Sequence, residues 1–163
     1  PFKLVEKYGV EPVRYFLLRE IPSTEDGDFS YKKLEERYNA DLANGLGNLA
    51  SRVAKLCEKV ESFPIDENLK ISPEISNLIE EYKFDEALKA GQAFIAEADK
   101  IVNEKKPWTL EGTNLKNVLF GLVARMRQIS KDLKSFMPET SDKLEQQFGV
   151  EKISSGASLF PRK

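Results

Sequence analysis

The longest uninterrupted pattern in the sequence is a proline-free stretch from Tyr31 to Glu61, in which apolar residues recur at spacings of three and four. That spacing matches the 3.6 residues per turn of an α-helix, so the stretch predicts one helix of about 30 residues, roughly 45 Å long. The apolar stripe consists of Leu34, Tyr38, Leu42, Leu46, Leu49, Val53, Leu56 and Val60. Because such a stripe must be covered by neighbouring helices, the pattern favours a helix bundle.

Two further stripes follow the same predicted helix. Small residues that would let a neighbour approach closely are Ala40, Ala43, Gly47, Ala50, Ala54 and Cys57. The polar stripe is Arg37, Asp41, Asn44, Asn48, Arg52, Lys55 and Lys59. Residues 45–50 also fit the G-x-G-x-x-A dinucleotide fingerprint, but that fingerprint requires a preceding strand and a helix that begins at the glycines. We expect close packing of a helix, or close approach of a ligand, at these glycines instead.

The rest of the chain also reads as helices separated by proline and glycine. We predict short helices at 2–8 and 11–19, a break at 21–28 and Ser30 as the N-cap of the long helix. After a loop at 62–73, we predict a helix from 74 to 106 with a kink near 82–84, a helix over 115–133 and a short helix over 139–148. The tail from 154 is expected to be irregular. The expected fold class is all-α: a bundle of four to five main helices preceded by two short ones.

Composition excludes several classes of function. The sequence contains no histidine, which removes the commonest general base and metal ligand, and residues 25–28 lack the alternating ligands of a calcium loop. We therefore expect no catalysis by this chain and no metal. One cysteine, no signal-peptide pattern and no apolar run of the length a membrane span needs predict a cytoplasmic protein. The start at Pro1 indicates a piece of a longer polypeptide.

The net charge of −2 gives no overall attraction to nucleic acid, so binding of RNA would require a local basic surface. Asn48 and Arg52 lie four residues apart on one helix face, with Asn44 and Lys55 beside them. An amide offers a donor and an acceptor to a base edge, and a guanidinium offers a planar fork of donors. The spacing alone is also compatible with a solvated face or an interhelical hydrogen bond, which is the commoner outcome.

Trp108 is the only tryptophan and directly follows Lys105, Lys106 and Pro107. Core packing is the default interpretation of a lone tryptophan. An indole held at the surface by Pro107 would instead be a stacking platform for an unpaired base, with the two lysines available for phosphate.

Several segments, taken in order, resemble one family. They are Phe2-Lys3-Leu4-Val5-Glu6-Lys7-Tyr8-Gly9, Arg14-Tyr15-Phe16-Leu17-Leu18-Arg19-Glu20, Asp26-Gly27-Asp28-Phe29-Ser30, Asn39-Ala40-Asp41-Leu42-Ala43-Asn44, Gly47-Asn48-Leu49-Ala50-Ser51-Arg52, Lys106-Pro107-Trp108, Phe136-Met137-Pro138-Glu139-Thr140 and Leu159-Phe160-Pro161-Arg162. Together they resemble the methionyl-tRNA synthetases, from just after the Lys-Met-Ser-Lys-Ser loop onward.

The resemblance implies a helical anticodon-binding domain that recognises CAU through Asn48, Arg52 and Trp108. Trp108 would stack on the first anticodon base, while Asn48 and Arg52 would bond base edges and backbone. From the polar stripe we infer Lys55 and Lys59 as candidate phosphate contacts, with Asn44, Lys105, Lys106 and Pro107 as further possible supporting RNA contacts. Arg14 and Arg19 are weaker candidates for contacts to the tRNA stem. The chain departs from the family at Asp99-Lys100-Ile101, where Asn-Lys/Arg-Tyr is usual, and this places a negative charge near the expected RNA site.

The same resemblance implies residues 1–29 as a stem-contact segment from the end of the catalytic half, 30–150 as the anticodon-binding domain and 151–163 as a tail. The catalytic signatures are absent, so this chain would be the tRNA-reading part of a ligase, without a cofactor of its own. The complete enzyme would use ATP with Mg and methionine, and the partners would be tRNA(Met) and the catalytic domain, with no DNA and no membrane. The alternatives are an isoleucyl-, valyl-, leucyl- or cysteinyl-tRNA synthetase, or a helical protein-interaction module that binds no RNA.

Overall fold

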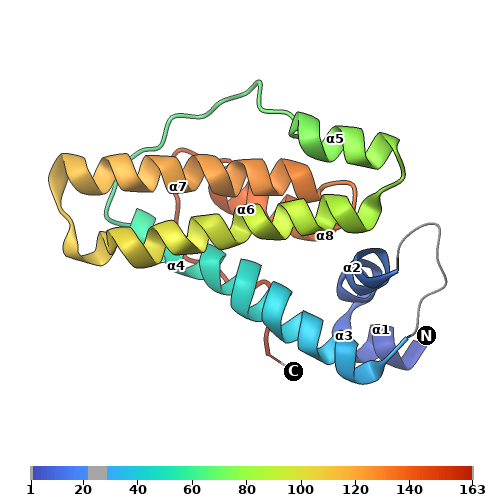
Figure 1. Cartoon of the computed structure of the whole chain (residues 1–163). Helices are drawn as coiled ribbons and strands as arrows, with labels where there is room; N and C mark the ends of the chain where they lie inside the picture. Colours follow the sequence, from blue (N-terminus) through green and yellow to red (C-terminus); the bar gives the residue numbers. More distant parts are fainter. Residues whose placement is uncertain (1, 22–28, 163) are drawn as a thin grey trace.

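The computed structural model describes residues 2–21 and 29–162, and these contain helices and no strand (Figure 1). The predicted all-α class is confirmed. The elements in order are α1 (Phe2–Tyr8), α2 (Val10–Glu20), α3 (Tyr31–Arg37), η1 (Tyr38–Gly47), α4 (Asn48–Cys57), α5 (Pro73–Glu80), α6 (Phe84–Lys105), η2 (Pro107–Thr109), α7 (Gly112–Leu133) and α8 (Pro138–Phe148). Ser30 caps α3 as predicted, since its hydroxyl accepts a bond from the Lys33 amide. Of the break predicted at 21–28, Ile21 is the C-cap of α2, and residues 22–28 lie outside the described residues.

The long helix predicted over 31–61 differs from the structure in its middle and at its end. The segment η1 is a π-helix, flanked by α3 and α4 without interruption. Apolar residues here are four apart, a spacing that exceeds the 3.6 residues of an α-helical turn and that the wider π turn accommodates. The helix ends at Cys57, because the amides of Lys59 and Val60 bond carbonyls only three residues back. The prediction of one regular α-helix ending at Glu61 was therefore wrong in both respects.

The chain from 73 to 148 forms four α-helices and the short 3₁₀ helix η2, and proline or a backbone turn marks several of the helix ends. The kink predicted near 82–84 is a full break between α5 and α6, where Tyr82 adopts a left-handed conformation with φ 59°. Proline occupies the first turn of both α5 and α8, where its missing amide loses no helical hydrogen bond. Pro138 thus begins α8 and does not itself end α7, which stops at Leu133.

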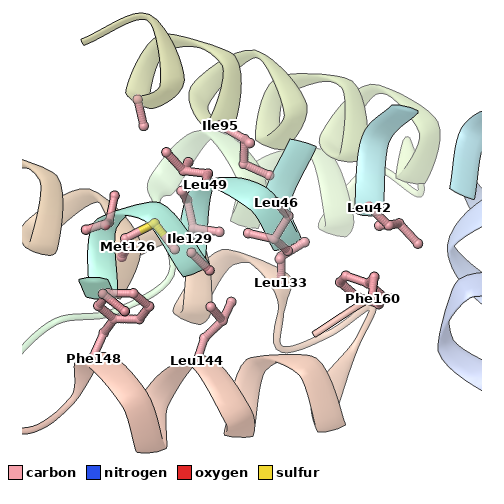
Figure 2. Packing of buried hydrophobic residues seen from close by; sticks show 14 of the residues in the cluster. Leu42, Leu46, Leu49, Ile95, Met126, Ile129, Leu133, Leu144, Phe148 and Phe160 are labelled. Carbon is pink, nitrogen blue, oxygen red and sulfur yellow. The ribbon is translucent and has the colours of Figure 1, made fainter. Parts of the chain in front are cut away.

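The helices α3, η1 and α4 follow one another as a single rod. The core lies between this rod and the antiparallel helices α6 and α7, and α8 lies behind α6 and α7 in the view of Figure 1. Figure 2 shows Leu46 and Leu49 of the rod among Ile95 of α6, Met126 and Ile129 of α7, and further apolar residues of α8. These side chains are 2% exposed or less. The amphipathic stripes predicted from the sequence are therefore the surfaces that build the bundle.

The C-terminal tail has no regular structure, as predicted, yet it belongs to the core. Phe160 is buried beside Tyr38, and the Tyr38 hydroxyl donates to the Pro161 carbonyl at 2.7 Å. A Cβ added to Gly47 would lie 3.6 Å from the Phe160 ring. That is an ordinary van der Waals distance, and the tightest contact of such a Cβ would be the Leu42 carbonyl within the same π-helix, at 3.0 Å. The tail therefore packs against Gly47, whereas the side chain nearest to Gly45 is Gln92 of α6.

The connection between α1 and α2 requires glycine. Gly9 has φ 91° and ψ 164°, a region that only glycine occupies at low energy. We expect Gly9→Ala to lower the free energy of unfolding by about 1–3 kcal/mol. Gly121 is the matched control, because it lies on the exposed side of α7 with open space around it.

Gly121→Ala should raise the free energy of unfolding by about 0.5–1 kcal/mol, because alanine loses less backbone entropy in a helix. Chemical denaturation of both variants measures the difference. Equal effects of the two substitutions would show that the positive φ of Gly9 is not a constraint.

Candidate nucleic-acid interface

Trp108 lies in the short 3₁₀ turn η2 that joins α6 to α7, at the end of the bundle away from α1 and α2 (Figure 1). Its side chain is 49% exposed, so the core interpretation of this tryptophan is wrong. The turn itself is well determined by local bonds: Lys106 takes the left-handed cap position with φ 44°, and its carbonyl accepts bonds from the amide and the hydroxyl of Thr109. Pro107 is buried beneath the turn. The arrangement presents an aromatic side chain to solvent on a turn that hydrogen bonds hold in place.

Arg52 projects from α4 towards α6. Its two terminal nitrogens donate to Asp99 Oδ1 at 2.7 Å and to Asn103 Oδ1 at 2.8 Å. Asn103 Nδ2 in turn donates to Asp99 Oδ2 at 2.8 Å. The interhelical hydrogen bond that the sequence left open is therefore present. Since 30% of the Arg52 side chain remains exposed, it is also accessible to a ligand.

Asn48 is exposed and lines a polar hollow of about 180 Å³ between the rod and the tail. Asn44, one turn earlier, accepts a bond from Arg162 Nε at 3.0 Å across the same hollow. The polar stripe is consequently divided. Asn44 and Asn48 face the tail, whereas Arg52 faces α6, and the earlier Arg37 bonds Glu20 of α2.

The lysines proposed as phosphate contacts fall into two classes. Lys55 is paired with Glu58 at 2.7 Å, and this bond, with two more from Ser155, lowers the pKa of Glu58 to about 2. Lys59, Lys105 and Lys106 are exposed and take part in no ion pair between described residues. These three lysines can therefore meet a phosphate without first leaving a carboxylate.

Arg14 and Arg19 lie on α2, far from Trp108 across the molecule (Figure 1). Arg14 is exposed, whereas the Nε of Arg19 is buried without a hydrogen-bond partner among the described residues. Their distance from the turn η2 separates them from Trp108 (Figure 1). Any RNA that touched both groups would have to extend along the bundle.

Nucleophilic chemistry has little support in the described residues. Burial raises the pKa of the Cys57 thiol to about 12, which keeps it protonated and unreactive near neutral pH. No cluster of three or more metal-ligating side chains occurs in the described part of the chain. Within that part, no helix has the length and apolar character to cross a membrane.

The sequence did not reveal that Asp99 and Asn103 hold Arg52. Asp99 stands out only as a departure from the family pattern, and Asn103 lies one turn later on the same helix face. Arg162 of the tail was likewise not assigned a role, although it contacts Asn44.

The chain is similar in sequence to known proteins. Residues 1–54 match the family described as tRNA synthetases class I (M). The methionine–tRNA ligase of Clostridium acetobutylicum is 32% identical over 99% of this chain and 31% of its own length. That of Caldanaerobacter subterraneus is 36% identical over 98% of this chain and 28% of its own length. The chain thus spans about three tenths of these relatives.

Solved structures show the same fold. Apo methionyl-tRNA synthetase of Mycobacterium tuberculosis superposes with a TM-score of 0.79 over 99% of this chain and 40% of that chain, at 24% identity. The form of that enzyme bound by methionyl-adenylate gives a TM-score of 0.80 over 98% of this chain and 39% of that one, also at 24% identity. The chain is thus similar along its whole length to one part of the methionyl-tRNA synthetases, in sequence and in helical fold.

Proposed function

We propose that this chain is the anticodon-binding part of a cytoplasmic methionine–tRNA ligase and recognises the CAU anticodon of tRNA(Met). The observation that carries the proposal is the half-exposed Trp108, which lies on a hydrogen-bonded turn next to Lys105 and Lys106. Neither lysine has an ion-pair partner among the described residues. An aromatic face next to free positive charge is the arrangement that binds unstacked bases of single-stranded RNA. Asn48, at the hollow beside the tail, and Arg52, against α6, would supply the hydrogen bonds to base edges.

The remaining part of such a ligase would carry the chemistry, with ATP, Mg and methionine as its substrates and cofactor. This chain would contribute selection of the tRNA. The exposed apolar side chains of the N-terminal helices, Phe2 at 89% and Val10 at 52%, support contact with the rest of a longer protein at that end. In this proposal residues 1–29 connect to the catalytic half, 30–150 bind the anticodon, and Arg14 and Arg19 face the tRNA stem.

Binding can be measured with the chain's own fluorescence, because Trp108 is its only tryptophan. We expect an anticodon stem-loop with CAU to change the Trp108 emission and to bind more tightly than the same stem-loop with another anticodon. Binding should weaken as salt rises, since counterions are released from the phosphates. Equal affinity for both loops would contradict anticodon recognition, and no binding at all would favour a protein-interaction module.

The base-reading residues can be tested by substitution. Asn48→Ala and Arg52→Ala should each weaken CAU binding by about 1–3 kcal/mol, or about five- to 150-fold, the range for a lost base-edge contact. Asn77→Ala is a matched control, since Asn77 is an exposed asparagine on α5. A large fall in melting temperature for Asn48→Ala, without a change in RNA affinity, would assign that residue to packing.

A further inference from the structure

The Arg52 guanidinium belongs to a closed ring of three hydrogen bonds. It donates to Asp99 and to Asn103, and Asn103 closes the ring by donating to the second oxygen of Asp99. The two α6 residues are four apart and so lie on the same side of the helix, where they meet α4. Because the ring involves both terminal nitrogens of Arg52, it fixes the plane of the guanidinium.

The ring leaves donors free. A guanidinium has five N–H groups, and the ring uses two of them. The three others remain for a ligand, on a side chain that is 30% exposed. A planar group held in one orientation loses little side-chain entropy when it bonds a base, so the ring prepares Arg52 for a directional contact.

The ring also compensates charge. Asp99 lies 2.7 Å from Arg52, so the pair carries almost no net charge towards a phosphate. The nearby turn differs in this respect, because Lys105 and Lys106 are exposed and enter no ion pair between described residues. Positive charges without an ion-pair partner provide the attraction to the RNA backbone, and this attraction makes the affinity depend on salt.

We propose that Asp99 and Asn103 are positioning residues that hold Arg52 as a charge-compensated hydrogen-bond donor. Arg52 then discriminates between anticodon bases, while Lys105 and Lys106 provide the attraction to phosphate. The proposal rests on the proposed function and divides it between two groups of residues. It also assigns a purpose to Asp99, whose negative charge next to an RNA surface is otherwise unfavourable.

The test measures the affinity of the chain for the CAU stem-loop and for a loop altered at one anticodon base, at a series of salt concentrations. For Asp99→Asn we expect the ratio of the two affinities to fall about tenfold, as expected for one lost base-reading interaction. Affinity for both loops should become more salt-dependent, with the slope of log K against log [salt] steeper by about 0.7 for one released charge on single-stranded RNA.

Two other variants separate orientation from charge. Asn103→Ala should lower the discrimination ratio without changing the salt slope, because it frees the orientation of Arg52 and alters no charge. Lys106→Ala should weaken the binding of both loops equally and make the slope of log K against log [salt] shallower by about 0.7. Glu97→Gln is the control for net charge, since Glu97 is also on α6 but pairs with Arg125 of α7, and it should preserve discrimination.

The pair of changes Arg52→Ala and Asp99→Asn shows whether Asp99 acts through Arg52. In the Arg52→Ala background, Asp99→Asn should leave the discrimination ratio unchanged. The proposal is overturned if the Asp99→Asn and Asn103→Ala variants have the same ratio of affinities for the two loops as the unmodified chain. It is also overturned if Asp99→Asn still lowers that ratio in the Arg52→Ala background. Absence of CAU preference in the unmodified chain would instead refute the proposed function itself.

Discussion

Trp108→Ala is expected to weaken binding of the CAU stem-loop by about 1–3 kcal/mol, or about five- to 150-fold, because one base loses its stacking surface. The melting temperature should change little, since the ring is 49% exposed and the turn is held by backbone bonds of Lys106 and Thr109 that do not involve the indole. Affinity is measured by anisotropy of a labelled RNA, because the substitution removes the fluorescent residue.

Two further variants control this result. Trp108→Phe keeps an aromatic face and should retain part of the affinity. Tyr82→Ala removes another exposed aromatic, at the connection before α6 and so at the opposite end of that helix, and should leave RNA binding unchanged. A loss of stability of about 3–5 kcal/mol in Trp108→Ala, typical of a large core side chain, would restore the core interpretation that the structure argues against.

Glu11→Ala is expected to cause the largest loss of stability among the polar substitutions. Glu11 lies on α2 and is only 7% exposed, yet its carboxylate accepts bonds from the amides of Glu139 and Thr140, at 2.6 and 2.9 Å, and from the Thr140 hydroxyl at 2.6 Å. These amides are in the first turn of α8, whose own N-cap residue, Met137, makes no side-chain capping bond. Glu11 therefore caps α8 from another helix, and its negative charge suits the helix N-terminus.

Removal of this carboxylate leaves buried donors without acceptors, and we expect the free energy of unfolding to fall by about 2–4 kcal/mol. The melting temperature should fall by about 5–15 °C for a chain of this size. Thermal unfolding measures the change. Glu6→Ala, at an exposed position on α1, should unfold within a degree or two of the unmodified chain. A Glu11→Ala variant as stable as Glu6→Ala would show that α8 does not depend on this cap.

Much of the fold was predictable because amphipathic periodicity is a local property. The predicted helices over 2–8, 115–133 and 139–148 agree with α1, α7 and α8 to within a few residues. The π-helix was not predictable, because an apolar spacing of four is compatible with amide bonds to the fourth or the fifth preceding residue. Only packing of residues such as Tyr38 and Leu42 against neighbouring elements selects between them.

The candidate site was predictable as a set of residue types and not as an arrangement. The sequence motifs singled out Asn48, Arg52 and Trp108, and their roles remain predictions. The exposure of Trp108 depends on where α6 and α7 bring the turn η2, which no local pattern reports. The partners of Arg52 are 47 and 51 residues away in sequence, so their meeting is a consequence of helix packing.

The sequence by itself determined an all-helical chain, the sides of the helices that are buried, and a family resemblance that the comparisons confirm. It did so because helical period, proline and cap residues act within one or two turns. The tertiary structure alone decided that Phe160 fills the space beside Gly47, that Glu11 caps α8 and that Asp99 compensates Arg52. Each of these contacts joins segments distant in sequence, and hydrogen bonds and burial at such contacts depend on three-dimensional proximity.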